Sequence, residues 1–430
     1  MKYAYLNGRI LDGTPEMQPQ DGLAVLVNGE IIEDIVSDTA VPEGYKQIDL
    51  EGAYLLPGLI NLHVHLAAGG KPPKKNEKPK DYKKTFRLLT SNKIVETVFR
   101  KQEEGYAKTE LMSGVTTLRA VGGILDFDGK LRDQINAGKK VGPRILAANT
   151  GVSVPGGHFA GSLATEASSP EEAAEHVRQI AKTKPDLIKL MVTGGVMDAS
   201  EEGEPGVLRM PPALIRAACD EAHRLGYKVA AHVESTEGVR VALENGVDTI
   251  EHGAIVTDKI VELFRERGAA DICTLSPTIP YALFELEESN APEVGKTNGI
   301  IVFEGIAECA RACLKNGIPV GLGSDTGCPF ITHYNFWREL VYFKRYCGVT
   351  SAFALHTATL GNAKIAGIDD ITGSIEKGKS ADFIVVKGNP LEDLRVLRKL
   401  SMVSMRGKLY RNPSYKPMKG VDELLDKYMI

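Results

Sequence analysis

The sequence predicts an α/β protein built as a (β/α)8 TIM-type barrel with a small composite β-sandwich domain made from both termini. Three observations predict this fold. Strand-like segments cluster at the two ends of the chain, strand candidates alternate with helical stretches in the middle, and eight such candidates follow one another over about three hundred residues. We therefore expect the composite domain at residues 1–56 and 369–430, and the barrel with the functional site at residues 57–368.

The two ends of the chain have the pattern of short strands joined by tight turns. Asn-Gly pairs at Asn7 and Asn28 stand between apolar runs, where they favour a hairpin because both turn positions tolerate positive φ. We expect strands from both ends to pair in one small domain. The segments rich in β-forming residues are 3–6, 23–27 and 30–36 near the N-terminus, and 373–375, 382–386 and 402–410 near the C-terminus.

The middle of the chain alternates strands and helices. Residues 212–225 and 236–245 have helical patterns. Strands that alternate with helices at this spacing indicate parallel β-α-β units, and eight of them favour a closed barrel. An open doubly wound sheet would have G-x-G-x-x-G after its first strand, and that sequence is absent there. The strand candidates are LLPGLINLHVHL, GVTTLRAVG, PRILAANTG, DLIKLMVTGG, KVAAHVES, DTIEHG, ICTLSPT and PVGLGSDTG.

The composition is that of an ordinary globular protein. Of 430 residues, 43% are hydrophobic and 25% are charged, which excludes a wholly disordered chain or a coiled-coil rod. The formal net charge of −4 offers no basic field to recruit nucleic acid or a membrane surface. The six scattered cysteines make no disulfide framework, and no apolar run reaches the length of a membrane span. We expect a soluble, cytoplasmic protein with a small-molecule substrate and no nucleic-acid or membrane partner. The sequence does not decide whether the chain forms a homo-oligomer.

Four histidines stand at the ends of predicted barrel strands. His63 and His65 are two residues apart, so both side chains can face the same side of the first strand and form a divalent-metal pair. His232 and His252 each close a strand, with one helix between them. Because neighbouring parallel strands end at one rim of a barrel, the two rings would share that rim. Either one alone is better explained as a core histidine, but the four together favour a metal site.

A carboxylate and an amine extend this set. Asp325 follows the glycine-rich strand in GLGSD, where it could cap a helix or, as an anion, bind a cation. Lys189 lies inside the apolar strand DLIKLMV, where a charged amine is costly unless it is paired or chemically altered. A lysine whose side chain simply reaches out to solvent is the alternative.

The order of these residues along the chain resembles that of the amidohydrolase superfamily. The resemblance is closest to the prolidase-like branch of metal-dependent carboxypeptidases and dipeptidases, which is related to imidazolonepropionases. It implies a barrel with a composite β-sandwich, in agreement with the strands expected at the two ends. The segments that carry it are LLPGLINLHVHL, GVTTLRAVGG, IKLMVTGG, AAHVES, DTIEHG, GLGSDTG and ATLGNAKIAG followed by GSIEKGKSADFIVV.

The resemblance implies two divalent metal ions in the barrel, with zinc as the expected metal. Lys189 would add carbon dioxide to become N6-carboxylysine and would bridge the two ions together with a hydroxide. Asp325 would bind a metal and also serve as the catalytic base. The implied ligands are His63, His65 and Asp325 for the more buried ion, His232 and His252 for the second ion, and Lys189 for both.

The implied chemistry is hydrolysis of a C–N bond in a small substrate such as a dipeptide or an N-acyl amino acid. Two nearby cations lower the pKa of a bridging water, and the outer ion polarises the substrate carbonyl. Asp325 would take the proton during attack and return it to the leaving amine. One alternative opens a cyclic amide such as an imidazolone or hydantoin ring. An alternative of another class is a catalytically silent barrel that acts as a structural or assembly partner.

Three further features concern the substrate. His158, on the glycine-rich loop VPGGH, would bind substrate or is a plain loop histidine. Related peptidases often have His-Ala-Tyr at the fifth strand, whereas this chain has His232, Val233 and Glu234. Glu234 could face a cationic group or cap the next helix, and we expect the cap. The lysine- and proline-rich segment Lys71–Lys84 is expected to be a solvated loop, with a lid over the barrel mouth as the alternative.

Overall fold

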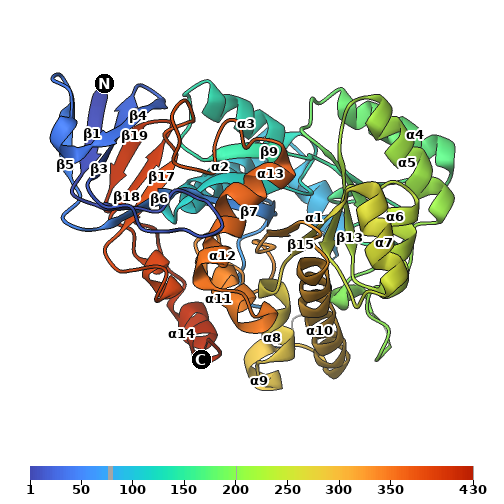
Figure 1. Ribbon diagram of the computed structural model, residues 1–430. Helices are drawn as coiled ribbons and strands as arrows, with labels where there is room; N and C mark the ends of the chain where they lie inside the picture. Colours follow the sequence, from blue (N-terminus) through green and yellow to red (C-terminus); the bar gives the residue numbers. More distant parts are fainter. Residues whose placement is uncertain (76–80, 200, 430) are drawn as a thin grey trace.

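The structure, a computed structural model, describes residues 1–75, 81–199 and 201–429. The chain has a β-rich part and a larger part of strands and helices (Figure 1). In the β-rich part, the first strands of the chain stand beside strands from its C-terminal region (Figure 1).

The β-rich part consists of two sheets. Their strands are β1 (Lys2–Leu6), β2 (Arg9–Ile10), β3 (Leu23–Asn28), β4 (Ile31–Ser37), β5 (Lys46–Asp49), β6 (Tyr54–Pro57), β17 (Phe383–Val386), β18 (Met402–Met405) and β19 (Lys408–Arg411). The sheet orders are β4-β3-β1-β5 and β19-β18-β17-β6-β2. In the second sheet Ile384 of β17 lies opposite Leu56 of β6, and the strands run antiparallel. The buried rings of Tyr5 and Phe383 meet edge to face, with centroids 4.8 Å apart. The predicted pairing of strands from both termini is confirmed.

The middle of the chain forms the barrel of parallel strands. They are β7 (Leu59–Val64), β8 (Val115–Ala120), β9 (Arg144–Ala147), β10 (Gly151–Ser153), β11 (Ala164–Glu166), β12 (Ile188–Met191), β13 (Val229–Val233), β14 (Thr249–His252), β15 (Ala270–Cys273) and β16 (Val320–Leu322). The first three pair as β7-β8-β9, and the others as β11-β10-β12-β13-β14-β15-β16. All the predicted barrel strands are present in the predicted order, whereas the short β10 and β11 were not predicted.

The first and last barrel strands meet through backbone hydrogen bonds. The N–H of Asp325 donates to the carbonyl oxygen of His63 over 2.9 Å, and the N–H of His65 donates to the carbonyl oxygen of Thr326 over 2.8 Å. Gly323 makes this approach possible, because a Cβ there would lie 2.4 Å from Cβ of His63. The chain segments that carry three of the predicted site residues are therefore fixed side by side.

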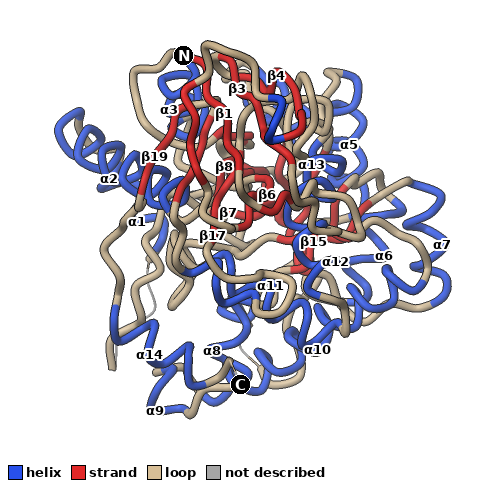
Figure 2. Tube along the Cα trace, turned by 60° about the vertical axis from the view of Figure 1, so that its left-hand side comes forward, coloured by secondary structure: helices blue, strands red, loops and turns tan. Residues whose placement is uncertain are grey.

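Helices lie around these strands (Figure 2). The predicted helices at 212–225 and 236–245 correspond to α5 and α6. Helices begin at residues that cap them. The side chain of Asn92, for example, accepts hydrogen bonds from the N–H groups of Ile94 and Val95 at the start of α2 (Lys93–Met112). The helices are α1 (Tyr82–Leu89), α2 (Lys93–Met112), α3 (Phe127–Asn136), α4 (Pro170–Ala181), α5 (Pro212–Arg224), α6 (Thr236–Glu244), α7 (Asp258–Arg267), α8 (Ile279–Ala282), α9 (Leu286–Ser289), α10 (Glu293–Lys315), α11 (Phe336–Cys347), α12 (Ser351–His356), α13 (Asn362–Ala366) and α14 (Lys419–Lys427). Among the described residues, no helix combines the length and the apolar character that crossing a bilayer requires.

Candidate metal centre and active site

The six predicted metal-site residues lie together at the carboxyl ends of the barrel strands. All are buried, and all line one chamber of about 130 Å³. They come from five different strands or from the turns directly after them. The residues are His63 in β7 and His65 just after it, Lys189 in β12, His232 in β13, His252 in β14 and Asp325 after β16.

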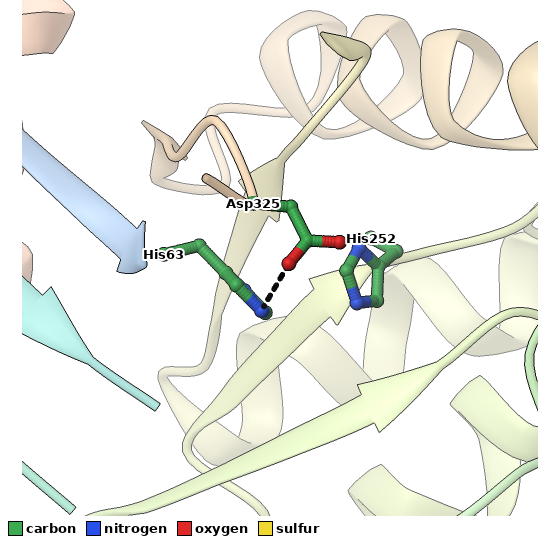
Figure 3. A group of neighbouring side chains, drawn as sticks. All are labelled: His63, His252 and Asp325. Carbon is green, nitrogen blue, oxygen red and sulfur yellow. Dashed lines mark ion pairs between the residues drawn. The ribbon is translucent and has the colours of Figure 1, made fainter. Parts of the chain in front are cut away.

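One group of possible ligands surrounds Asp325. The side chains of His63, His252 and Asp325 point toward one another (Figure 3), and each offers a ligand atom within 4.8 Å of the others. The Nε2 atoms of His63 and His65 lie 3.5 and 3.3 Å from Oδ1 of Asp325. The structure thus joins residues far apart in sequence around one carboxylate oxygen.

A second group overlaps the first. His232, Glu234 and His252 offer ligand atoms within 4.8 Å of one another, and the rings of His232 and His252 have centroids 4.7 Å apart. His252 therefore belongs to both groups. Glu234 was not predicted to belong to this group. It follows His232 by two residues, and in an extended chain this spacing directs both side chains to the same face. That spacing is the sequence signal that could have found it.

Burial sets the protonation state of the imidazoles. Burial, followed by the charge of Lys189, lowers the pKa of His63 to about 4. Burial also holds the pKa of both His232 and His252 well below the usual value. All three rings are therefore neutral near pH 7, which is the protonation state that binds a metal ion.

The amine and the carboxylate complete the donor set. Nζ of Lys189 is buried and has no hydrogen-bond partner in the described part of the chain. Burial lowers the pKa of Lys189 to about 8, so part of the amine is uncharged near neutral pH. Burial alone would raise the pKa of Asp325, but His63 and His65 outweigh it and hold that pKa well below its usual value. Neutral imidazoles and an ionised carboxylate are ligands that divalent cations take in proteins, and the buried amine of Lys189 beside them lacks a hydrogen-bond partner in the described part of the chain.

Hydrogen bonds to groups outside the chamber lining orient the four rings. A hydrogen bond to one ring nitrogen of a histidine determines which nitrogen remains available to a metal ion. For three of the rings the held atom is Nδ1, which leaves Nε2 free. The bonds run from His63 Nδ1 to Glu251 Oε2 over 2.7 Å, from His65 Nδ1 to the Gly122 carbonyl over 2.9 Å, from His252 Nδ1 to Thr274 Oγ1 over 2.7 Å, and from His232 Nε2 to the Gly194 carbonyl over 3.2 Å.

The backbone takes an unusual conformation at two of the site residues. His252 has φ 75° and Asp325 has φ 52°, both in the left-handed region that only a few per cent of residues other than glycine adopt. Conformations of this kind persist where the surrounding structure enforces them, and they concentrate at functional sites.

His158 lies against the proposed metal-site residues. Its ring stacks on that of His232, with centroids 4.2 Å apart and planes 9° apart. Its Nδ1 atom lies 2.5 Å from Oδ2 of Asp198, which also accepts the N–H of Gly195 over 2.9 Å. Asp198 was missed by the sequence analysis, because its loop has no pattern that sets it apart.

Glu234 does not cap the following helix, so that expectation was wrong. The hydroxyl of Ser235 accepts the N–H of Gly238 at the start of α6 instead. The Glu234 carboxylate turns into the chamber, where it accepts the N–H of Val196 over 2.9 Å. Burial, and next Asp325, raise its pKa to about 8.

The predicted loop or lid at Lys71–Lys84 is described only in part, since residues 76–80 lie outside the described residues. Beyond that gap the chain forms α1, and Tyr82 at its start lines the chamber.

Comparisons with known proteins identify relatives that cover nearly the whole chain. The profile of the amidohydrolase family matches residues 54–410, and that of the NagA composite domain matches residues 2–55. A Bifidobacterium longum structure assigned as a prolidase is 35% identical, with a TM-score of 0.87, and the match covers 100% of this chain and 99% of that one. A Xaa-Pro dipeptidase with methionine bound in its active site is 30% identical, with a TM-score of 0.82, covering 96% and 100%. Ochratoxinase from Aspergillus niger is 24% identical over 443 residues, which is 95% of this chain and 87% of the relative.

The family match runs from β6 in the sandwich through the whole barrel to β19. Together with the two solved structures it confirms the predicted resemblance to prolidase-like amidohydrolases. The chain belongs to the amidohydrolase family and is a hydrolase of amide C–N bonds.

Proposed function

We propose that this chain is a hydrolase that uses two divalent metal ions, with zinc as the expected metal, to cleave the amide bond of a dipeptide or an N-acyl amino acid. One observation carries the proposal: the six proposed metal ligands, which are four imidazoles, the carboxylate of Asp325 and the unpartnered buried amine of Lys189, are all among the residues that line a single chamber of about 130 Å³. The similarity to a Xaa-Pro dipeptidase supports a small amide as the substrate.

The proposed ligands combine the arrangement that the family resemblance implies with the contacts between these side chains. His63, His65 and Asp325 would hold one ion, and His232 with His252 would hold the second. Lys189 would serve both ions as N6-carboxylysine, because its depressed pKa leaves free amine to react with carbon dioxide. When bound, the ions supply Lewis-acid polarisation of the substrate carbonyl and activation of the attacking water.

Asp325 is the proposed proton carrier. Its low pKa keeps the carboxylate ionised, and only the ionised form can accept a proton from the attacking water. Sγ of Cys328 donates to Oδ2 of Asp325 over 3.3 Å, and Oδ1 is the oxygen that faces His63 and His65. The same carboxyl group would then deliver the proton to the nitrogen of the leaving amine, which is needed because an amide anion is a poor leaving group.

His158 is the proposed substrate contact. Asp198 holds its Nδ1 atom, so Nε2 is left to hydrogen-bond a substrate in the chamber. The stacking on His232 places this contact directly beside the proposed metal ligands.

The test is a hydrolysis assay on protein stripped of metal and reloaded with zinc. The panel contains N-acyl amino acids, dipeptides, and imidazolone and hydantoin rings, and the readout is amine release or ring opening. We expect chelation to abolish cleavage of the linear amides, zinc to restore it, and Lys189→Ala to remove both activity and part of the bound metal. Lys182→Ala, on an exposed lysine at the end of α4, is the matched control.

The outcomes separate the alternatives. Full activity without divalent metal would overturn the metal-dependent proposal. Cleavage of the rings alone would assign the chain to cyclic amides, and stoichiometric zinc without any hydrolysis would indicate a catalytically silent barrel. Carbon-13 bicarbonate gives a direct check on Lys189, because a carbamate signal should appear in the wild-type protein and be missing in Lys189→Ala.

A further inference from the structure

A second, larger cavity opens beside the metal-site chamber. It has a volume of about 470 Å³, compared with about 130 Å³ for the chamber itself. The two spaces share part of their walls, so they lie directly next to each other. The shared residues are His65, Tyr82, Phe159, Cys328 and Pro329. We call the larger space the side compartment.

The side compartment has an apolar wall. Phe86 and Leu89 of α1, together with Ala67 and Leu163, line it and pack on the buried cluster around Ile124. None of its described lining residues is an Asp or a Glu, and Lys71 is the one Lys or Arg among them. An apolar cavity of this size next to a reaction site is suited to an apolar group of the substrate.

The polar side chains of the compartment are largely satisfied within the protein. The hydroxyl of Ser162 donates to the carbonyl of Phe159 over 2.8 Å, and that of Thr85 donates to the carbonyl of Asp81 over 3.0 Å. Tyr106 accepts a hydrogen bond from Gln102. These groups therefore offer little to a charged or strongly polar ligand, for which leaving water would be costly.

The other side of the chamber is polar. His158, Asp198 and Glu234 line the chamber but not the side compartment. An unsubstituted acyl chain carries no charge, so it matches the apolar wall of the side compartment. A dipeptide bound in the same orientation would have to place its α-ammonium group there.

We propose that the side compartment binds a bulky apolar acyl group, so that the substrate is an N-acyl amino acid with an aromatic or long-chain acyl half rather than a free dipeptide. This inference rests on the proposed amide hydrolysis and narrows its substrate class. Each buried methylene of the acyl chain should raise kcat/KM about fourfold until the compartment is full. The amide itself would lie in the small chamber beside Asp325.

The first experiment compares substrates on the zinc-loaded full chain. One series is N-acyl glycines with acetyl, butanoyl, hexanoyl, benzoyl and 2-naphthoyl groups. The other is a matched pair, N-(3-phenylpropanoyl)glycine and phenylalanylglycine, which differ by the α-ammonium group alone. We expect kcat/KM to rise along the series and to be at least about tenfold higher for the uncharged member of the pair. Equal values for acetyl and naphthoyl substrates, or a preference for phenylalanylglycine, would overturn the inference while amide hydrolysis stands.

The second experiment alters the wall. Leu89→Trp adds volume inside the compartment, and Leu88→Trp is the matched control because Leu88, its neighbour on α1, is 62% exposed. Leu89→Trp should raise KM for the naphthoyl substrate at least about tenfold and leave the acetyl substrate within about twofold. Leu88→Trp should change neither, and circular dichroism shows whether each variant folds.

A binding measurement separates this inference from the proposed function. Fluorescence titration of the metal-free protein with N-(2-naphthoyl)glycine needs no catalysis. Binding that Leu89→Trp weakens and Leu88→Trp does not would support the side compartment even if no amide were cleaved, in which case amide hydrolysis itself would be the failed proposal. Binding that is absent, or that both variants leave unchanged, would overturn the inference.

Discussion

Nδ1 of His63 lies 2.7 Å from Oε2 of Glu251, and both side chains are buried. The same carboxylate accepts two hydrogen bonds from Nη2 of Arg119, over 2.7 and 2.9 Å, and one from the hydroxyl of Thr249 over 2.7 Å. Burial alone would raise the pKa of Glu251, but Arg119 and then His63 lower it below the usual value. An ionised carboxylate in this position fixes the ring of His63 with Nε2 toward the chamber.

Glu251→Gln should weaken metal binding without removing any metal ligand. The amide keeps the shape of the side chain but loses the charge that orients His63 and neutralises Arg119. We expect a ten- to hundredfold rise in the metal dissociation constant, measured by competition with a chelator of known affinity. Glu244→Gln, on the surface at the end of α6, is the control. Unchanged affinity in Glu251→Gln would show that the hydrogen bond does not position the ring.

The sequence pointed to the proposed metal ligands but not to the groups that orient them. His63 and His65 were found because alternation along a strand puts both on one side, and Lys189 because a charge stood inside an apolar strand. Arg119 and Glu251 carry the same signal, in GVTTLRAVG and DTIEHG. Their pairing could not be predicted, because the two charged residues are 132 positions apart and nothing in the sequence pattern indicates that they are in contact.

The fold was predictable for a related reason. The strands of a barrel of this type follow one another largely in chain order, and their carboxyl ends lie at one rim. The apolar runs from β7 to β16 were therefore enough to predict that residues at the ends of these strands lie near one another. The side compartment was not predictable, since its wall combines α1 with turns after several strands, and contacts between loops leave no periodic pattern.

Asp325→Asn should abolish most activity while the fold survives. Asn is the replacement best able to keep the left-handed backbone, where φ is 52°. The change removes the negative charge that would accept and return the proton, so kcat should fall by about 100- to 10,000-fold. Single-turnover kinetics and metal content of the same sample check this together. Loss of activity with full metal content supports a proton carrier, whereas parallel loss of metal would show that Asp325 serves mainly as a ligand.

Arg144→Met should destabilise the connection between the barrel and the sandwich. Nη1 of Arg144, in β9, lies 2.7 Å from Oδ2 of the fully buried Asp382, the residue before β17. Removing the guanidinium leaves a buried carboxylate without its cation, at a cost of about 3 kcal/mol in the free energy of unfolding. Urea denaturation measures the change. Arg395→Met, in the exposed pair with Asp393, should cost less than about 1 kcal/mol.

Glu103 should make the protein less stable as the pH rises. This side chain in α2 is 1% exposed, and Oε1 has no hydrogen-bond partner among the described residues. Burial, and next the nearby carboxyl group of Asp128, raise its pKa well above the usual value. The folded protein therefore holds a proton that the unfolded chain releases above about pH 4.5, so the free energy of unfolding falls with pH until the folded group also titrates.

Glu103→Gln removes that titration and keeps an uncharged side chain of the same size. The variant should gain stability relative to the wild type as the pH rises, by up to about 1.4 kcal/mol per pH unit between the two pKa values. Thermal unfolding from pH 5 to pH 9 measures the difference. Glu104→Gln, at the next position of α2, replaces a carboxylate that pairs with Lys140 over 2.7 Å near the surface, and its curve should stay parallel to that of the wild type. If the stability curves of Glu103→Gln and the wild type stay parallel instead, the pKa of Glu103 is not raised in the folded protein and the prediction is wrong.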